Sequence, residues 1–283
     1  MKRIGFLFTL IFISLFTSIL STNKLDAGTL RVATYNVWNP TFEQKYSGKD
    51  TWDQRLPFIV QNIISAETDV ICLEEVSEKS YLELIQNPEI RNNFTTHYIS
   101  HAPSQPAQKE GRDGVAFFYR TEKVTLIKFV QSGVGTRPSH RRDYYADLKL
   151  KEPVDTPVKF RIAGTHLDST DLMIGDTQLS SLVEDVLKSN DEELDFAVVC
   201  GDFNEGEDEP LRPRYEMMQN AGFITDGSTE TTRPEALDVT HKGHVDWIYV
   251  KKISALDFDL ISSAPIGDER ASDHKLILTD IEF

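Results

Sequence analysis

The amino-acid sequence predicts a layered α/β sandwich that forms one large domain. Short apolar runs rich in β-branched residues recur from Leu30 onward, and two longer stretches between them have the apolar spacing of helices. With 283 residues, of which 40% are hydrophobic, the chain can bury a substantial core. We find no internal repeat and no linker long enough to separate two domains.

Eight apolar, strand-like runs predict the strands. They cover residues 30–37, 70–76, 114–119, 143–150, 159–166, 196–200, 245–250 and 275–281. Several of these runs end in polar residues of catalytic type, so the ends of the predicted strands are where we look for a site.

Two stripes of apolar residues at helical spacing predict the helices. The first includes Ile59, Ile63 and Ile64, and we expect Pro57 to lie in the first turn of that helix. The second stripe comprises Leu179, Leu182, Val183, Val186 and Leu187. We interpret both stripes as core faces and assign them no function.

The first 27 residues differ in kind from the rest of the chain. Lys2 and Arg3 precede an uncharged apolar run over residues 4–20, and the next charged residue is Lys24. This pattern predicts a signal peptide within residues 1–27, with the cleavage point left open, and a catalytic domain over residues 28–283. We therefore expect a secreted or periplasmic monomer with no stable membrane association after cleavage. An uncleaved N-terminal anchor is the alternative.

The chain is strongly acidic. Its formal net charge is −15, and loss of the two positive charges of Lys2 and Arg3 with a signal peptide would change this to −17. Such a field opposes long-range attraction to polyanions and argues against a protein that coats duplex nucleic acid. It does not exclude a nuclease, because a bound divalent cation and a local basic patch can reverse the sign at a site.

The only two cysteines, Cys72 and Cys200, both lie inside strand-like runs. On a strand, Cys72 points to the face opposite Glu75, whereas Cys200 shares a face with Asp202. If Glu75 and Asp202 converge, the two thiols should not. We therefore predict two free core cysteines in preference to a disulfide, although export would permit one.

Polar residues of few types end or closely follow the predicted strands. They are Asn36, Glu75, His166, Asp202, Asn204, Asp273 and His274. Any one of them alone is most simply a cap or a turn former. Together they have the composition of a hydrolytic site that uses a hard metal ion, whereas a structural zinc site would require clusters of Cys or His that are absent.

This ordered set resembles the endonuclease/exonuclease/phosphatase superfamily, which includes deoxyribonucleases, apurinic endonucleases, neutral sphingomyelinases and inositol phosphatases. The most specific motifs are Gly-Asp-Phe-Asn at 201–204 and Ser-Asp-His at 272–274, with Val-Asp-Trp-Ile at 245–248 between them. Residues 165–170, followed by Gln178, are similar to the tyrosyl-DNA phosphodiesterase branch. The resemblance implies a four-layered α/β sandwich in which two mixed β-sheets pack face to face with helices outside.

The resemblance also implies a cation site. Glu75 would hold Mg²⁺, for which Mn²⁺ is a possible substitute, with Asn36 and Asp273 nearby. Mg²⁺ prefers few carboxylates and keeps several waters, which agrees with this sparse set of oxygen donors. The usual Leu-Gln-Glu of the family is Leu73-Glu74-Glu75 here, so the role of Glu74 stays open.

The implied reaction is in-line attack of water on a phosphodiester. His274 would be the general base, which requires a neutral imidazole near pH 7, and Asp246 would orient it. Asp202 and Asn204 match positions that orient the nucleophile and bind the phosphoryl oxygen. His166 matches a position that hydrogen-bonds a phosphate oxygen, and its alternative is a core histidine.

Two further residues are candidates for substrate binding. Tyr119 ends the run 114–119, and Arg142 directly precedes the run 143–150. Arginine suits bidentate contact with phosphate. The cluster formed by Arg142 with Arg137, His140 and Arg141 has a simpler alternative, because clustered surface arginines also pair with acidic neighbours.

The expected substrate is nucleic acid or a nucleotide-linked adduct. A phospholipid or a sugar phosphate is the alternative, since an exported acidic protein suits either. A catalytically inactive binding protein of the same fold is disfavoured, because every residue that the motifs require is present.

Overall fold

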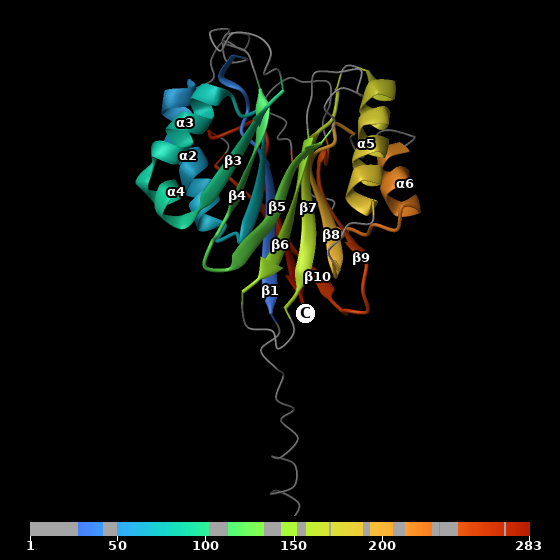
Figure 1. The fold of residues 1–283 in the computed structure, drawn as a ribbon. Coiled ribbons are helices and arrows are strands. Elements are labelled where there is room, and N and C mark those ends of the chain that lie inside the picture. Colours follow the sequence, from blue (N-terminus) through green and yellow to red (C-terminus); the bar gives the residue numbers. More distant parts are fainter. Residues whose placement is uncertain are drawn as a thin grey trace, which may run out of the picture.

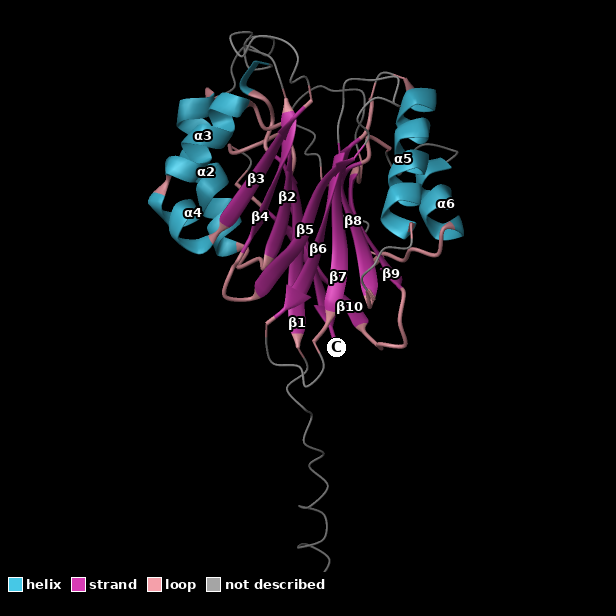
Figure 2. Ribbon diagram, in the orientation of Figure 1, coloured by secondary structure: helices cyan, strands magenta, loops and turns pink. Residues whose placement is uncertain are grey.

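The protein is a four-layered sandwich. The computed structural model describes residues 28–41, 50–101, 113–132, 143–151, 157–169, 171–188, 193–205, 213–227, 232, 243–268 and 270–283. Within them, two mixed β-sheets pack face to face and helices cover the outer face of each sheet (Figure 1, Figure 2). The predicted α/β sandwich is confirmed, whereas the predicted signal peptide lies outside the described residues.

The first sheet has six strands in the order β10-β11-β1-β2-β4-β3. Their bounds are β1 Thr29–Asn36, β2 Val70–Glu74, β3 Thr95–Ser100, β4 Gly114–Tyr119, β10 Asp259–Ile266 and β11 Leu276–Glu282. The pair β1 and β2 is parallel, and the other neighbours are antiparallel. The carboxyl ends of β1 and β2 therefore lie side by side.

The second sheet has five strands in the order β5-β6-β7-β8-β9. Their bounds are β5 Val124–Ser132, β6 Asp143–Leu150, β7 Lys159–His166, β8 Phe196–Asp202 and β9 Asp246–Lys252. Here β7 and β8 form the parallel pair, while β9 runs antiparallel to β8. The sheet thus brings the ends of β7 and β8 beside the start of β9.

The helices fall into two groups. On the outer face of the first sheet lie α2 Trp52–Ser65, α3 Glu78–Gln86 and α4 Pro88–Asn93, and on that of the second lie α5 Leu172–Leu187 and α6 Pro213–Asn220. The N-terminus of α2 is fixed where the Thr51 N–H donates to Gln54 Oε1 at 2.8 Å. Because α2 begins at Trp52, Pro57 lies inside the helix, and its predicted place in the first turn was wrong.

The core divides into three apolar clusters. The largest lies between the sheets and includes Val32, Phe117, Phe160 and Val198, all fully buried or nearly so. The other two join each sheet to its own helices, as the apolar stripes predicted. Burial of each such side chain contributes roughly 1.5–3 kcal/mol, which makes the sandwich a rigid support for the loops at its edge.

Cys72 and Cys200 form a disulfide in the core between the sheets, with their Cα atoms 6.7 Å apart. The prediction of two free cysteines was therefore wrong. It assumed regular strand alternation from Cys72 to Glu75, but β2 ends at Glu74, and Glu75 has a left-handed backbone with a φ of 57°. The side chain of Glu75 therefore leaves the alternation, and the face of Cys72 is free to meet the second sheet.

Candidate active site

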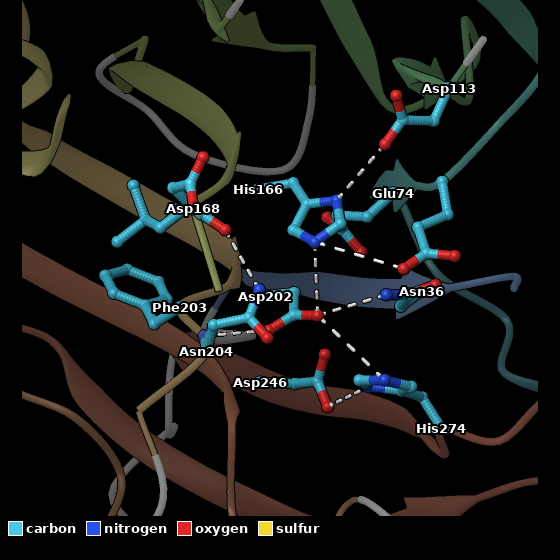
Figure 3. A network of polar contacts seen from close by, with 12 residues as sticks. Asn36, Glu74, Asp113, His166, Asp168, Asp202, Phe203, Asn204, Asp246 and His274 are labelled. Carbon is cyan, nitrogen blue, oxygen red and sulfur yellow. Dashed lines mark hydrogen bonds and ion pairs between the residues drawn. The ribbon is translucent and has the colours of Figure 1, made fainter. Parts of the chain in front are cut away.

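Polar side chains from both sheets meet at one edge of the sandwich. Asn36 ends β1 and Glu74 ends β2, and these residues are paired across the two parallel strands. In the second sheet, His166 at the end of β7 is paired with Asp202 at the end of β8. Asp202 is in turn paired with Asp246, the first residue of β9 (Figure 3). The fold thus gathers residues that are up to 210 positions apart (246 − 36) in the sequence.

The Asp202 carboxylate lies at the centre of this group. Its Oδ2 accepts a hydrogen bond of 3.0 Å from Asn36 Nδ2, across the two sheets. The same oxygen lies 3.6 Å from His166 Nε2 and 3.9 Å from His274 Nε2. Burial and the neighbouring Asp246 raise the pKa of the Asp202 carboxyl. Two ring nitrogens and one amide therefore face a single buried carboxylate oxygen (Figure 3).

His274 is fixed by hydrogen bonds on its ring and on its backbone. Its Nδ1 lies 2.8 Å from Asp246 Oδ2, an oxygen that also accepts a hydrogen bond of 2.6 Å from Thr232 Oγ1. The His274 N–H donates to Ser272 Oγ, and Ser272 Oγ donates to the carbonyl of Asn36. The structure thus contains the predicted contact between His274 and Asp246. This contact leaves His274 Nε2 pointing toward Asp202.

The charges around His274 bear on the neutral imidazole that a general base requires. Burial lowers its pKa, but the charges of Asp246, Asp273 and Asp202, with the hydrogen bond to Asp246, outweigh burial and raise the pKa to about 10. The motifs predicted one carboxylate beside the ring, whereas the fold places three around it. These carboxylates favour the protonated form of His274, and a nearby positive charge would offset them.

Glu75 and Asp273 form the second part of the site. Glu75 Oε2 accepts a hydrogen bond of 2.9 Å from the Asn39 N–H, and Oε1 lies 4.0 Å from His166 Nε2. Burial and the nearby charge of Asp273 raise the pKa of Glu75 to about 7. A bound cation would relieve the repulsion between these two carboxylates.

The donors near Glu75 suit a hard divalent cation. Glu75 and Asp273 offer carboxylate oxygens. Asn36 Oδ1 accepts the Trp38 N–H at 3.0 Å with one lone pair, and its second lone pair could bind a cation. All are oxygen donors, and carboxylates are few, which is the set that Mg²⁺ prefers. The residues predicted as cation ligands therefore fit the ion by their chemistry.

A second group of donors lies close by. One ligand atom each from Asp202, Asp246 and His274 lies within 4.8 Å of the others. In this group His274 Nδ1 is already hydrogen-bonded to Asp246 Oδ2, and Thr232 donates to the same oxygen. The Glu75 side and this group are therefore both candidate metal sites by their donor atoms.

Glu74 is a buried carboxyl whose role the sequence left open. Its side chain is fully buried, and Thr34 Oγ1 donates to Oε1 at 2.8 Å. Burial, with the nearby charges of Asp246 and Asp202, raises its pKa well above the usual range. Glu74 is therefore a buried carboxyl beneath the site whose neutral form is favoured by its surroundings.

Asp113 is a site residue that the sequence did not single out. It directly precedes β4, which runs antiparallel to β2 and so begins where β2 ends. Its Oδ1 lies 3.4 Å from His101 Nδ1, and its Oδ2 lies 4.0 Å from His166 Nδ1. Attention to residues that precede antiparallel strands could have identified Asp113.

Asn204 supports the loop that follows β8. Its N–H donates to Asp202 Oδ1 at 2.8 Å, and its side-chain Nδ2 donates to the Leu167 carbonyl at 2.9 Å. The backbone of Asn204 is left-handed, with a φ of 50°. Its amide thus joins the loops after β7 and β8.

Tyr119 lies at the opposite edge of the sandwich. It is paired with Val70, the first residue of β2, and its ring stacks on Phe117 and His97. Because β4 is antiparallel to β2, the end of β4 points away from the end of β2. The structure therefore does not bring Tyr119 together with the other predicted site residues, and Arg142 lies outside the described residues.

A family model describes most of this chain. The model of the Endonuclease/Exonuclease/phosphatase family matches residues 33–274, which includes every strand-end residue described above. This chain belongs to that family. It is therefore a hydrolase of the endonuclease/exonuclease/phosphatase type, and the resemblance predicted from its motifs is confirmed.

Two relatives within this family have broad similarity to the chain. Nocturnin of Drosophila melanogaster is 26% identical over 227 residues, which cover 72% of this chain and 33% of that protein. The CCR4-Not complex 3'-5'-exoribonuclease subunit Ccr4 of Candida albicans is 22% identical over 201 residues, which cover 60% of this chain and 26% of that protein. The chain thus spans a third or less of the length of these relatives.

Solved structures of the family share the fold. ANGEL2, a 2',3'-cyclic phosphatase, has a TM-score of 0.68 at 18% identity, covering 91% of this chain and 96% of that chain. A humanized Danio rerio TDP2 has a TM-score of 0.63 at 15% identity, covering 90% of this chain and 99% of that chain. These similarities show a common architecture around the strand-end site.

Proposed function

We propose that this hydrolase is a divalent-cation-dependent phosphodiesterase that cleaves a phosphodiester by in-line attack of water. The convergence of Asp202, His166 and the His274–Asp246 pair beside the Glu75 carboxylate carries the proposal. A phosphodiester resists attack because of its negative charge, so a site that cleaves it needs both charge compensation and proton transfer. The Glu75 side of the site would provide the charge compensation, and the His274–Asp246 pair would provide the proton transfer.

Glu75, Asp273 and Asn36 would hold the cation, with Mg²⁺ as the expected ion and Mn²⁺ as a substitute. When bound, the cation would neutralise charge on the phosphoryl oxygens and offset part of the negative charge that raises the pKa of His274. The raised pKa of Glu75, caused by burial and by Asp273, supports a cation on this side.

The remaining residues would position water and move protons. His274 Nε2 would take a proton from the attacking water while Nδ1 stays hydrogen-bonded to Asp246. Asp202 and Asn204 would orient that water and the phosphoryl group. His166 Nε2, between Asp202 and Glu75, would donate a hydrogen bond to a phosphoryl oxygen.

We propose nucleic acid, or a nucleotide-linked adduct, as the substrate. The 3'-5'-exoribonuclease subunit Ccr4 and the 2',3'-cyclic phosphatase ANGEL2 support a ribonucleotide phosphodiester. A phospholipid or sugar phosphate is the second candidate, because a net charge of −15 gives no general attraction to nucleic acid.

We also propose that the protein is exported and acts as a monomer. Lys2, Arg3 and the apolar run over residues 4–20 support export, and the Cys72–Cys200 disulfide suits an oxidising compartment. Among the helices that the structure describes, none is long and apolar enough to span a membrane. Finding the protein in the cytoplasm with both thiols reduced would contradict export.

A substrate panel tests the proposed function. The purified protein with Mg²⁺ would be offered plasmid DNA, RNA, a 5'-tyrosyl oligonucleotide, sphingomyelin and an inositol phosphate. We expect cleavage of at least one nucleic-acid substrate and loss of that cleavage in Glu75→Gln. Cleavage of lipid alone would replace the nucleic-acid proposal with the second candidate, and cleavage of nothing would reject the enzyme proposal.

A further inference from the structure

The strands β1 and β8 end in the same local structure, although they belong to different sheets. Asn36 Oδ1 accepts the N–H of Trp38 at 3.0 Å, and Asp202 Oδ1 accepts the N–H of Asn204 at 2.8 Å. Trp38 and Asn204, each two residues after the strand end, are both left-handed, with φ of 57° and 50°. Residues other than glycine hold this conformation only where their surroundings fix it.

On the side of β1, the surroundings are supplied by Arg55 of α2. This side chain is 1% exposed, and its guanidinium donates to the carbonyls of Val37 and Trp38 at 2.9 Å each. It also donates to the carbonyl of Ala271 at 2.7 Å. Arg55 thus ties the loop after Asn36 to the loop that leads into residues 272–274.

On the side of β8, Arg214 of α6 makes the equivalent contacts. It too is 1% exposed, and its Nη1 donates to the carbonyls of Phe203 and Asn204, the latter at 3.3 Å. Its Nη2 donates to the carbonyl of Asp168 at 3.2 Å. Arg214 thus ties the loop after Asp202 to the loop that follows β7.

The two arginines therefore occupy matching places. Each donates to the carbonyls one and two positions after a strand-end residue, Asn36 or Asp202, and each reaches a second loop that carries site residues. Arginine suits this task because its planar guanidinium presents five donors in a fixed fork. Lysine keeps the charge but has all three of its donors on one nitrogen, and it cannot bridge two loops in the same way.

We propose that Arg55 and Arg214 are a matched pair of positioning residues with separate tasks. Arg55 sets the loops that carry the cation ligands, since residues 37–39 include Asn39, whose N–H holds Glu75, and residues 271–274 include Asp273. Arg214 sets the loops beside His166 and Asp202, which would bind the phosphoryl group and orient water. This division rests on the proposed function, because it assigns cation binding to one side and positioning of the substrate and water to the other.

The test compares Arg55→Lys and Arg214→Lys with wild type and with a third buried arginine. Arg161 of β7 is fully buried and makes a bidentate contact with Asp147 at 2.6 and 2.8 Å, five positions before His166. Arg161→Lys therefore controls for the general cost of losing a buried guanidinium. Each protein is measured for Mg²⁺ affinity by calorimetry without substrate, for kcat, for thermal stability and for local hydrogen exchange.

Arg55→Lys should weaken Mg²⁺ binding by roughly 10–100-fold, the usual effect of losing a group that orients metal ligands. Hydrogen exchange should accelerate over residues 37–39 and 271–274. Arg214→Lys should leave Mg²⁺ affinity unchanged, lower kcat by roughly 10–100-fold, and accelerate exchange over residues 167–169 and 203–205. Arg161→Lys should lower the Tm and change neither Mg²⁺ affinity nor kcat.

Two results would overturn the proposal. If both site variants behave as Arg161→Lys does, the arginines are merely structural; if both change Mg²⁺ affinity and kcat alike, they have no separate tasks. A lysine variant that does not fold is replaced by Arg55→Gln or Arg214→Gln under the same criteria. Failure of the proposed function would give a different result, because wild type would then neither bind Mg²⁺ nor cleave substrate. In that case the hydrogen exchange of the loops alone would show whether Arg55 and Arg214 each hold their own pair of loops.

Discussion

The protonation of His274 depends on how many charges the fold places around it. The sequence supplied the partner, Asp246, because the motif spacing matched a known family. It could not supply the proximity of Asp202, whose Oδ2 lies 3.9 Å from His274 Nε2 through sheet pairing. The resulting pKa of about 10 makes the base role of His274 dependent on a nearby positive charge.

Replacement of His274 tests that role. His274→Ala should lower kcat by about 10²–10⁴, because it removes the proton acceptor for water. His97→Ala is a suitable control, since that half-buried ring of the edge strand β3 stacks on Phe129 with a centroid separation of 4.5 Å. Unchanged kcat in His274→Ala, with intact folding, would reject the assignment.

Glu74 should give the protein a measurable pH dependence of stability. The pKa of this carboxyl is higher in the folded chain than its usual 4.5, because burial disfavours the anion. The folded state therefore binds more protons, and the free energy of unfolding should fall by up to about 1.4 kcal/mol per pH unit as the pH rises above that value.

Glu74→Gln should remove this contribution and make the protein more stable at neutral pH. Urea unfolding between pH 4 and pH 8 measures the effect, and Glu193→Gln, at an exposed position, serves as the control. Equal pH slopes for wild type and Glu74→Gln would show that Glu74 ionises normally.

The strands that the sequence predicted are those in the interior of the sheets, together with β9. The missed strands β3, β5 and β10 are three of the four sheet edges. Edge strands are partly exposed and carry polar residues, so they lack a continuous apolar run; β10, for example, is mostly exposed or half-buried. The missed helices α3, α4 and α6 have nine residues or fewer, too short for a clear apolar stripe.

The site was predictable where strands end and less so where they begin. Asn36, His166 and Asp202 ended predicted runs, and family motifs added Asp246 and His274. Placement of Asp113 and Tyr119 required the antiparallel pairing of β4 with β2, which no local pattern specifies.

The disulfide between β2 and β8 should stabilise the packing of the two sheets. It closes a sequence separation of 128 residues, which restricts the unfolded chain. Cys72→Ala/Cys200→Ala should therefore lower the free energy of unfolding by about 2–4 kcal/mol, measured by urea titration. Wild type unfolded in a reducing agent should approach the value of the variant, and no difference between oxidised and reduced wild type would contradict the prediction.

The whole molecule consists of two sheet-and-helix halves that meet at one edge. The first half supplies Glu75, Asn36, Asp273 and His274, and the second supplies His166, Asp202 and Asp246. The proposed proton acceptor, His274, is oriented by Asp246 of the other half, so the complete site requires the packed sandwich. Because the whole chain is acidic, with a net charge of −15, the proposed anionic substrate would have to be attracted through the proposed cation.

Cation dependence tests the central claim most directly. Wild type would be stripped with EDTA and assayed on a phosphodiester that it cleaves, before and after titration with Mg²⁺, alongside Glu75→Gln as the matched variant. We predict that wild type does not cleave the substrate in chelator and that Mg²⁺ restores its activity. The activity of Glu75→Gln should recover little at the same Mg²⁺ concentrations. Full activity of wild type in EDTA would contradict the proposed cation-dependent mechanism.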